Sequence, residues 1–307
     1  MSDTLGSIDR RLLDEIASLH SIPQGAHNIR KNGKGISRNS TANIEITPKA
    51  DKPGIDVVIR PGTVNESVHI PVILSESGLT DVVYNTFEVG ERSDVLIVAG
   101  CGIHNSGLSD SRHDGVHEFI VRKGAHMRYV EKHYGEGQGR RILNPVTVVH
   151  IEENASAELE LVQIRGVDST DRETRISLAK GARIVITERL LTSGDQVAES
   201  RITIDLNGED STAQVISRSV AKDRSQQVFY FTLNGRNRCR GHVQCDSIVM
   251  DQSHVQSIPE VGAYHSEAQL IHEAAIGRIA GEQLLKLMSL GLTEEEAEAT
   301  ILEGFLA

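Results

Sequence analysis

Aromatic residues are scarce in this sequence of 307 residues, and tryptophan is absent altogether. Phenylalanine and tyrosine together supply only 3% of the chain, so it offers few rings on which nucleic-acid bases or sugars could stack. An excess of positive charge is also lacking, since the formal net charge is −11. Nucleic-acid-binding domains carry a basic surface, so the composition argues against nucleic acid as the main partner.

Long apolar runs are missing as well. No run reaches the roughly 18 residues that a membrane span requires, and we expect no membrane segment. Residues 1–20 contain acids and no apolar centre, unlike a signal peptide. The chain has three cysteines, an odd number that fits reduced thiols better than a disulfide framework. These features predict a cytoplasmic protein.

The motifs of several common enzymes are also missing. Residues 33–35 read Gly-Lys-Gly, but no Ser or Thr follows the lysine and no glycine precedes Gly33 by five residues. The chain contains His117-Glu118 and His272-Glu273, yet neither pair has the second histidine of an H-E-x-x-H site, and there is no G-x-S-x-G elbow. Because the phosphate-loop pattern fails at 33–35, we assign no ATP-binding site to this chain.

The N-terminal region is expected to be a short helix followed by a loop. Leu12, Ile16 and Leu19 recur at helical spacing and predict an amphipathic helix over 8–20. The segment 25–41 is rich in Gly, Asn, Lys and Arg, which favours a solvated basic turn.

Short apolar alternations dominate from residue 44 onward. The runs at 55–59, 82–89 and 94–99 are typical strands, because Val, Ile and Thr are frequent and Gly, Asn, Asp or Pro separate the runs. Many short strands without helical patterns between them predict an all-β body.

A repeat lies within this body. Four turn residues follow one another at intervals of 27 residues, namely Asn154, Gly181, Gly208 and Gly235. Gly and Asn tolerate the positive φ that tight turns require. Before two of these turns the apolar residues superpose at the same interval, Ile202, Ile204 and Leu206 on Phe229, Phe231 and Leu233. A fixed period with two strands per repeat is typical of a β-solenoid, and a β-sandwich is the alternative.

The end of the chain is expected to be helical. Residues 280–290 place apolar side chains on one side, and Gly291 is a natural C-cap. Thr293 and Glu296 form a capping box for a second helix whose apolar stripe includes Ile301. The two helices either cap the solenoid or present a groove to a partner.

The segment 235–277 concentrates candidate metal ligands. It contains Cys245 and the adjacent pair His272 and Glu273, which together supply a soft thiolate, an imidazole and a hard carboxylate. Strand alternation puts Cys245 on one face, with His242 among the polar residues of the other face. His272 and Glu273 would point to opposite faces of a strand, so only one of them could share a face with Cys245 unless a bulge intervenes. Residues 266–275 are ambiguous between strand and helix.

An earlier cluster offers a second set of ligands. Cys101 and His104 form a C-x-x-H pair, and His113 and His117 form an H-x-x-x-H pair. By residue type the four could hold a tetrahedral zinc ion, although ordinary loop histidines are the simpler interpretation.

The segment that begins at Cys245 resembles a known protein family. Cys245-Asp246-Ser247-Ile248, then Pro259 and then IHEAAIGRIAGEQLLKLMSLGLTEEEAEATILEGF at 271–305, look like the C-terminal half of SufB and SufD proteins. The short chain and GAHNIRKNG at 25–33 look more like the compact archaeal and anaerobe form. The resemblance is strong over 235–307 and extends more weakly to about residue 20.

The resemblance implies a mainly β fold, a right-handed parallel β-helix with a short N-terminal helix and a C-terminal helical hairpin. It implies a non-catalytic scaffold for iron–sulfur cluster assembly and transfer to acceptor apo-proteins, with a SufC-type ABC ATPase docked on the C-terminal helices. Cys245 and Glu273, with His272 as neighbour, would hold the transient cluster. Cys101 and His104 are further metal-ligand candidates. A single short chain would pair with itself, forming a homodimer through the β-helix.

The expected domains are an N-terminal helix and basic loop at 1–43, a β-helix core at 44–275 and an ATPase-docking region at 276–307. Two other functions remain as alternatives. One is a zinc protein that uses Cys101, His104, His113 and His117. The other is a carbohydrate-active enzyme with carboxylates in a solenoid groove, against which the scarcity of aromatic residues counts.

Overall fold

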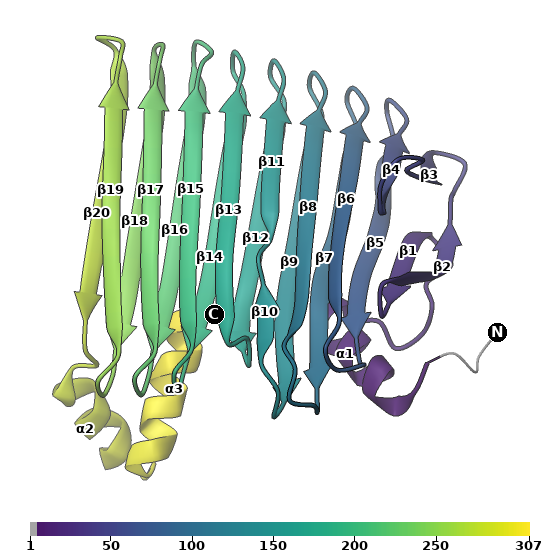
Figure 1. The fold of residues 1–307 in the computed structure, drawn as a ribbon. Coiled ribbons are helices and arrows are strands. Elements are labelled where there is room, and N and C mark those ends of the chain that lie inside the picture. Colours follow the sequence, from purple (N-terminus) through teal and green to yellow (C-terminus); the bar gives the residue numbers. More distant parts are fainter. Residues whose placement is uncertain (1–4) are drawn as a thin grey trace.

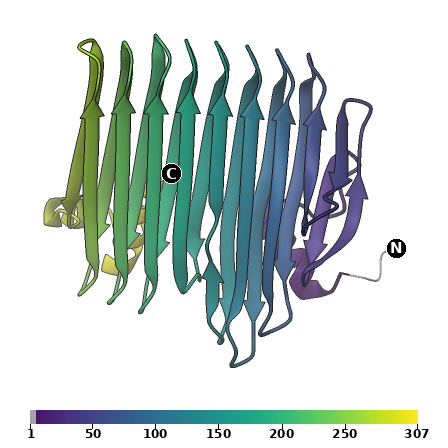
Figure 2. The same cartoon turned by 45° about the horizontal axis from the view of Figure 1, so that its top comes forward.

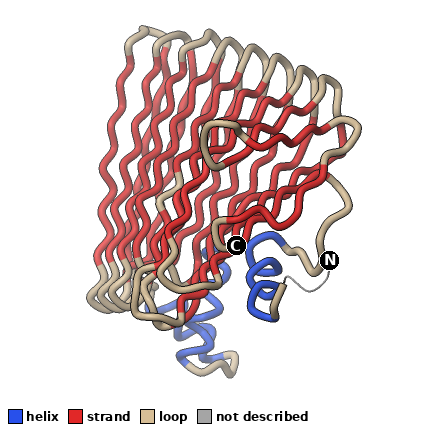
Figure 3. The backbone as a smooth tube through the Cα atoms, turned by 45° about the vertical axis from the view of Figure 1, so that its right-hand side comes forward, coloured by secondary structure: helices blue, strands red, loops and turns tan. Residues whose placement is uncertain are grey.

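The computed structural model describes residues 5–307, and most of them form a parallel β-solenoid of about eight turns (Figure 1). Successive strands along the solenoid alternate between two sheets, which face each other across the core (Figure 3). The predicted mainly β fold, a β-helix with a short N-terminal helix and C-terminal helices, is therefore confirmed. The β-sandwich alternative is wrong.

Each sheet has ten strands. The first sheet runs in the order β2 (Lys34–Asn39), β1 (Ala26–Lys31), β5 (Val64–Leu74), β7 (Asp94–Asn105), β9 (His126–Gly137), β12 (Ser156–Arg165), β14 (Arg183–Thr192), β16 (Ser211–Ala221), β18 (Cys239–Val249) and β20 (Ala268–Gly277). The second sheet comprises β3 (Ile44–Pro48), β4 (Gly54–Ile59), β6 (Thr80–Val89), β8 (Ser111–Val121), β10 (Arg141–Leu143), β11 (Val146–Ile151), β13 (Ser169–Leu178), β15 (Val197–Leu206), β17 (Gln226–Gly235) and β19 (His254–Ala263). Figure 2 gives a second view of the strand order.

Alternation along the strands builds the core. Every second residue points inward, and inward residues of neighbouring coils stack in rows. Phe87 of β6 stacks on Phe119 of β8 with ring centroids 4.6 Å apart. Such rows fix the register, because a one-residue slip would turn the whole apolar set of a strand to the solvent.

The repeat is less regular than the sequence predicts. Ile202 lies opposite Phe231, not Phe229, so this coil spans 29 residues instead of 27. The turn positions shift accordingly, because the left-handed residue in the turn near Gly208 is Asp210, with φ of 59°. A shift of two residues keeps every side chain on the same face, which is why the apolar pattern alone did not reveal it.

The N-terminal segment 25–41, predicted as a loop, instead contains the strands β1 and β2. They pair as an antiparallel hairpin around Gly33, whose φ is +77°. The strand β1 also pairs in parallel with β5, so the hairpin closes the N-terminal edge of the first sheet. The predicted N-terminal helix is confirmed as α1 (Ser7–Ala17). It packs its Leu12 against Gly102 and covers the outer face of β7.

Two helices follow the last strand, α2 (Gly281–Ser289) and α3 (Glu294–Leu306). The predicted capping box is present, since the Glu296 amide donates to Thr293 Oγ1 and the Thr293 amide donates to Glu296 Oε2. The helix α3 lies beside β16, where Lys222 pairs with Glu298 at 2.9 Å. Within residues 5–307, no helix is long and apolar enough to cross a membrane. The three-domain division stays a prediction.

Candidate functional site

Cys245 lies on the inner face of β18 and is completely buried. Its inward neighbours on the same strand are Val243 and Ser247, as the sequence alternation predicts. Burial raises the pKa of the Cys245 thiol to about 11, although the nearby hydroxyls of Ser257 and Ser247 offset part of the effect. The Ser257 hydroxyl has no hydrogen-bond partner of ordinary geometry. Cys245 is therefore a protonated thiol within the core of the solenoid, near the hydroxyls of Ser247 and Ser257.

His272 shares this inner face. The residue lies in β20, directly opposite the inward Val243. Ala274, two positions further along β20, lies opposite Cys245. Strand spacing puts such diagonal neighbours roughly 8 Å apart at their Cα atoms, within reach of an imidazole. Both ring nitrogens are buried without a hydrogen-bond partner. Burial, and next His242, lower the pKa of His272, which favours the neutral imidazole.

Glu273 points the other way. It lies opposite Gln244 on the outer face, and its carboxylate stands 3.6 Å from His242 Nε2. The predicted opposition of His272 and Glu273 is therefore confirmed, and the segment that was ambiguous between strand and helix is the strand β20. In this conformation the sheet separates Glu273 from Cys245.

Sequence reasoning missed the buried polar groups behind Cys245. Ser217 of β16 lies directly opposite Cys245 in the register. Its hydroxyl donates to Glu188 Oε2 at 2.8 Å, and Ser200 donates to Glu188 Oε1 at 2.6 Å. All three side chains are buried. Polar residues at inward positions of β14, β15 and β16 carried the signal, but only the register brings them together.

The two strands that hold this region are the last of their sheets. Within the described chain, β19 pairs only with β17, and β20 pairs only with β18. Consequently inner-face residues are open at this end: Val261 is 44% exposed, and so is Ile276. The site occupies the final two coils of a solenoid whose end is uncovered.

The earlier cluster is only partly assembled. Cys101 of β7 is buried and faces the interior. His113 and His117 of β8 are also buried and face the interior. His104 points outward, where its Nδ1 lies 2.8 Å from Glu136 Oε1. The four side chains considered as an alternative zinc set do not converge in this structure, because His104 lies on the other face of β7 from Cys101. Among residues 5–307, no three His, Cys, Asp or Glu side chains stand in a ready-made metal-binding group.

The three cysteines cannot act together. All are buried and free. Cys239 and Cys245 are six residues apart on β18, which is roughly 20 Å along a strand. Five strand spacings separate Cys101 from Cys245 in the first sheet, which is roughly 24 Å.

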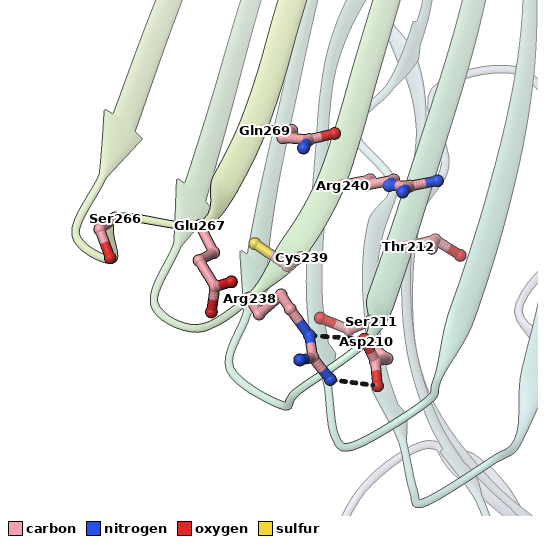
Figure 4. Close-up of a pocket in the computed structure, with 9 residues that line it drawn as sticks. All are labelled: Asp210, Ser211, Thr212, Arg238, Cys239, Arg240, Ser266, Glu267 and Gln269. Carbon is pink, nitrogen blue, oxygen red and sulfur yellow. Dashed lines mark hydrogen bonds and ion pairs between the residues drawn. The ribbon is translucent and has the colours of Figure 1, made fainter.

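An open pocket lies at the start of β16, β18 and β20 and has a volume of about 560 Å³. Cys239 forms part of its wall, and Arg238 crosses it to Asp210 with Nε 2.9 Å from Oδ1 (Figure 4). Its nine described lining residues include no aromatic ring and neither Cys245 nor His272. The pocket is thus separate from the thiol site and offers no surface for sugar stacking.

Comparison with known proteins gives a consistent result. Residues 73–305 match the family model described as SUF system FeS cluster assembly, SufBD core domain. An iron–sulfur cluster assembly SufBD family protein of Methanothermobacter thermautotrophicus is 30% identical over 77% of this chain and 58% of its own length. One from Pyrococcus horikoshii is 26% identical over 95% of this chain and 84% of its own length.

The match covers both the solenoid and the C-terminal helices, including Cys245 and His272. The chain spans 58% of the length of the Methanothermobacter relative and 60% of a similar protein of Archaeoglobus fulgidus. The family model alone covers well over half of the chain. This protein belongs to the SufBD family of iron–sulfur cluster assembly proteins.

Proposed function

We propose that this protein is a scaffold on which an iron–sulfur cluster is assembled and from which it is transferred. The observation that carries the proposal is that the Cys245 thiol and the unpartnered imidazole of His272 lie on the same inner face of two neighbouring strands, at the open end of a SufBD-family solenoid. The cluster is the cargo of the protein, and acceptor apo-proteins receive it.

The ligand chemistry suits a transient cluster. Thiolates bind iron strongly, and a site completed by imidazole or carboxylate holds iron less tightly than one with four cysteines. Cys245 must release a proton to become a ligand, and it must also become accessible, because it is completely buried. Assembly on Cys245 therefore requires β19 and β20 to move away from it.

Glu273 remains a proposed second ligand. The strand β20 is an edge strand with a hydrogen-bonded neighbour on one side only, so it is less restrained than the inner strands of its sheet. A one-residue change of register would exchange the faces of His272 and Glu273. A second copy could also supply either group across the open end.

A homodimer through the solenoid end fits the exposed strands. Unpaired edges and open apolar residues normally require a cover, and Val261 and Ile276 provide such residues on the inner face. Stacking the last coil on that of a second copy would bury them. It would also place two copies of Cys245 and His272 near one interface, as an isologous arrangement requires.

The C-terminal helices are the proposed docking site of a SufC-type ABC ATPase. The helix α2 has no buried residue, and its exposed apolar side chains include Leu285 and Met288, which are 66% and 38% exposed. An apolar helix face without a partner is typical of an interaction surface. ATP hydrolysis would then be carried out by the partner. Substitution of the Walker lysine of the partner should abolish ATP hydrolysis by the purified complex.

Cluster transfer tests the scaffold role directly. Wild-type protein reconstituted anaerobically is incubated with an apo-ferredoxin, and the acceptor is re-isolated and assayed for its cluster. We expect transfer from the wild type and from a Cys239→Ser control, and none from Cys245→Ser. Equal cluster gain by the acceptor when the scaffold is left out would contradict the proposal.

A further inference from the structure

An open groove crosses the outer face of the first sheet, close to the start of its last strands. It has a volume of about 460 Å³ and lies over β14, β16, β18 and β20. Four side chains form its polar part, namely Arg183, Thr212, Arg240 and Gln269. The last three also line the pocket in Figure 4, so the two spaces are continuous. We refer to the space around these four residues as the outer groove.

The four polar residues form one row across neighbouring strands. Arg183 of β14 lies opposite Thr212 of β16, which lies opposite Arg240 of β18. Gln269 of β20 completes the row. Neighbouring strands are roughly 4.8 Å apart, so the Cα atoms of the two arginines are separated by roughly 10 Å. Two cations, a hydroxyl and an amide are therefore presented on the same side of the sheet.

Arg183 and Arg240 differ from the other arginines on the strands of the described chain. Each of the others makes a hydrogen bond, an ion pair or a contact with an aromatic ring, as Arg189 does with Glu160 at 2.7 Å. Within residues 5–307, Arg183 and Arg240 make none of these contacts. Both side chains are exposed, so their guanidinium groups are available to a ligand.

The outer groove is positively charged, although the net charge of the chain is −11. Its described lining contains no Asp or Glu. In the adjoining pocket, Asp210 accepts hydrogen bonds from Arg238 at 2.9 Å, and Glu267 lines that pocket but not the groove. Guanidinium groups bind carboxylates through paired, charge-assisted hydrogen bonds. A ligand that carries carboxylates is therefore complementary to the groove.

Apolar side chains accompany the two arginines. Val185 and Ile271 line the groove and are 37% and 53% exposed. A small free anion would leave both side chains uncovered, whereas an acidic protein segment with an apolar residue would cover them. Nucleic acid fits less well, because the net charge is negative and the described lining has no Phe, Tyr or Trp. The chemistry of the groove thus favours an acidic segment of a protein.

The position of the groove indicates which protein this is. Arg240 precedes Cys245 by five residues on β18, which is roughly 17 Å along a strand. The C-terminal helices lie toward the other end of these strands (Figure 1), where Arg218 of β16 donates to the Phe305 carbonyl oxygen. A protein in the groove would reach the last coils without competing for those helices. A protein that receives the cluster has to make this approach.

We propose that the outer groove docks an acidic segment of the acceptor apo-protein, with carboxylates on Arg183 and Arg240 and an apolar side chain against Val185 and Ile271. The inference rests on the proposed scaffold function, because it names the surface used by the acceptor. Docking makes and breaks no covalent bond. Complementary charges speed encounter and fix orientation, so the groove sets how much acceptor is needed and not how fast a docked acceptor is loaded.

Binding of an acceptor tests the groove without any cluster. A fluorescently labelled, acidic apo-ferredoxin is titrated with the full-length scaffold, and anisotropy gives the Kd. Arg183→Glu combined with Arg240→Glu, the groove variant, should raise the Kd about tenfold or more. Arg10→Glu combined with Lys34→Glu makes the same change of net charge near the N-terminus and should leave the Kd unchanged. Added salt should weaken binding by the wild type more than by the groove variant.

Cluster transfer separates docking from assembly. The reconstituted wild type and groove variant are mixed with increasing amounts of apo-ferredoxin, and the initial rate of transfer is measured. Both should form the same charge-transfer band and reach the same maximal rate, but the variant should need about tenfold more acceptor for half-saturation. Absence of the band from the wild type would contradict the scaffold function, and the anisotropy titration would still decide whether the groove binds the acceptor.

Two results would each overturn the docking proposal. One is a wild-type scaffold that does not bind the apo-ferredoxin, and the other is a groove variant that binds it as tightly as the wild type. If the groove variant instead lost the ATPase partner in co-purification and kept the apo-ferredoxin, the groove would belong to the ATPase. Circular dichroism checks the fold of each variant. Arg240→Gln, which removes one charge and adds none, should also weaken binding and serves if the groove variant does not fold.

Discussion

The imidazole of His272 packs edge-on against the ring of Phe231, with ring centroids 5.6 Å apart. The contact orients the imidazole on the inner face of β20 without occupying either nitrogen, and neither nitrogen has a hydrogen-bond partner. The adjacent Glu273 is directed to the outer face. In this conformation the imidazole, not the carboxylate, shares the inner face with Cys245.

This arrangement predicts an order of effects. His272→Ala should shorten the lifetime of a reconstituted cluster at least about tenfold, and Phe231→Leu should shorten it less, because it removes only the ring that orients a ligand. The lifetime is measured as loss of visible absorption after an iron chelator is added under anaerobic conditions. If Glu273→Ala shortened the lifetime while His272→Ala left it unchanged, the carboxylate and not the imidazole would be the second ligand of the cluster.

The thiol of Cys245 should react slowly in the isolated protein. It is completely buried, and burial raises its pKa to about 11, while the thiolate is the reactive form. Near pH 8 we expect slow labelling by iodoacetamide, and a marked acceleration when the complex with the ATPase binds ATP. Mass spectrometry of the peptide containing Cys245 measures both rates. Rapid labelling of the isolated chain would show that the final coil is already open.

The buried pair of Glu131 and Arg172 predicts a pH-dependent effect on stability. Burial alone would raise the pKa of Glu131, but the charges of Arg172 and His133 hold it well below its usual value. The contribution of this carboxylate is therefore present above pH of about 4.5 and is lost only as the pH falls toward the lowered pKa. Replacing Arg172 should raise the pKa of Glu131 instead of lowering it, because the effect of burial is then no longer offset by the charge of the arginine.

Arg172→Met should lower the free energy of unfolding near pH 7 by about 3–5 kcal/mol, since Glu131 is left buried without a cation. The difference from wild type should shrink at pH 5, where Glu131 of the variant takes up a proton. Urea unfolding at pH 7 and pH 5 measures the difference in the free energy of unfolding between the variant and the wild type. Arg175→Met, an exposed change on the same strand, is the control and should cost roughly 1 kcal/mol or less. A difference equal at both pH values would mean that Glu131 is not the cause.

Val261→Asp should prevent dimerisation. This inner-face residue is 44% exposed at the open end of the solenoid, and a buried, unpaired carboxylate would oppose the stacking of two last coils. Sedimentation velocity should find a dimer for the wild type and a monomer for the variant. Val58→Asp, at a residue of β4 that is 42% exposed, is the matched control. A wild-type protein that is monomeric at all concentrations would contradict the predicted interface.

Leu285→Asp should release the ATPase partner. Leu285 is 66% exposed on α2, and a charge in an apolar contact costs binding energy. Co-purification of a tagged partner measures the loss. Leu108→Asp, at a fully exposed apolar residue in the loop between β7 and β8, serves as the control. Unchanged co-purification of Leu285→Asp would move the docking surface elsewhere.

Much of the fold could be predicted from the sequence, because alternation and turn residues are local signals. The strands at 55–59 and 82–89 and the capping box at Thr293 follow from such patterns. The hairpin of β1 and β2 could not be predicted from them. Its polar residues are held by pairing with β5, a contact between segments distant in sequence.

The site was predicted in part for the same reason. Alternation gave the face of Cys245 and the opposition of His272 and Glu273. It could not give the partners of Cys101, because His133 reaches it through a register between β7 and β9 that spans 32 residues. His104 lies on the opposite face from Cys101 because the two residues are three positions apart on the strand, and an odd offset reverses the face.

Anaerobic reconstitution with iron and sulfide, followed by visible absorption, decides whether Cys245 anchors a cluster. The wild type and Cys239→Ser should develop a sulfur-to-iron charge-transfer band, and Cys245→Ser should not. A band that survives in Cys245→Ser would place the cluster on another thiol. If no band developed in the wild type, the scaffold function proposed for this chain would be wrong.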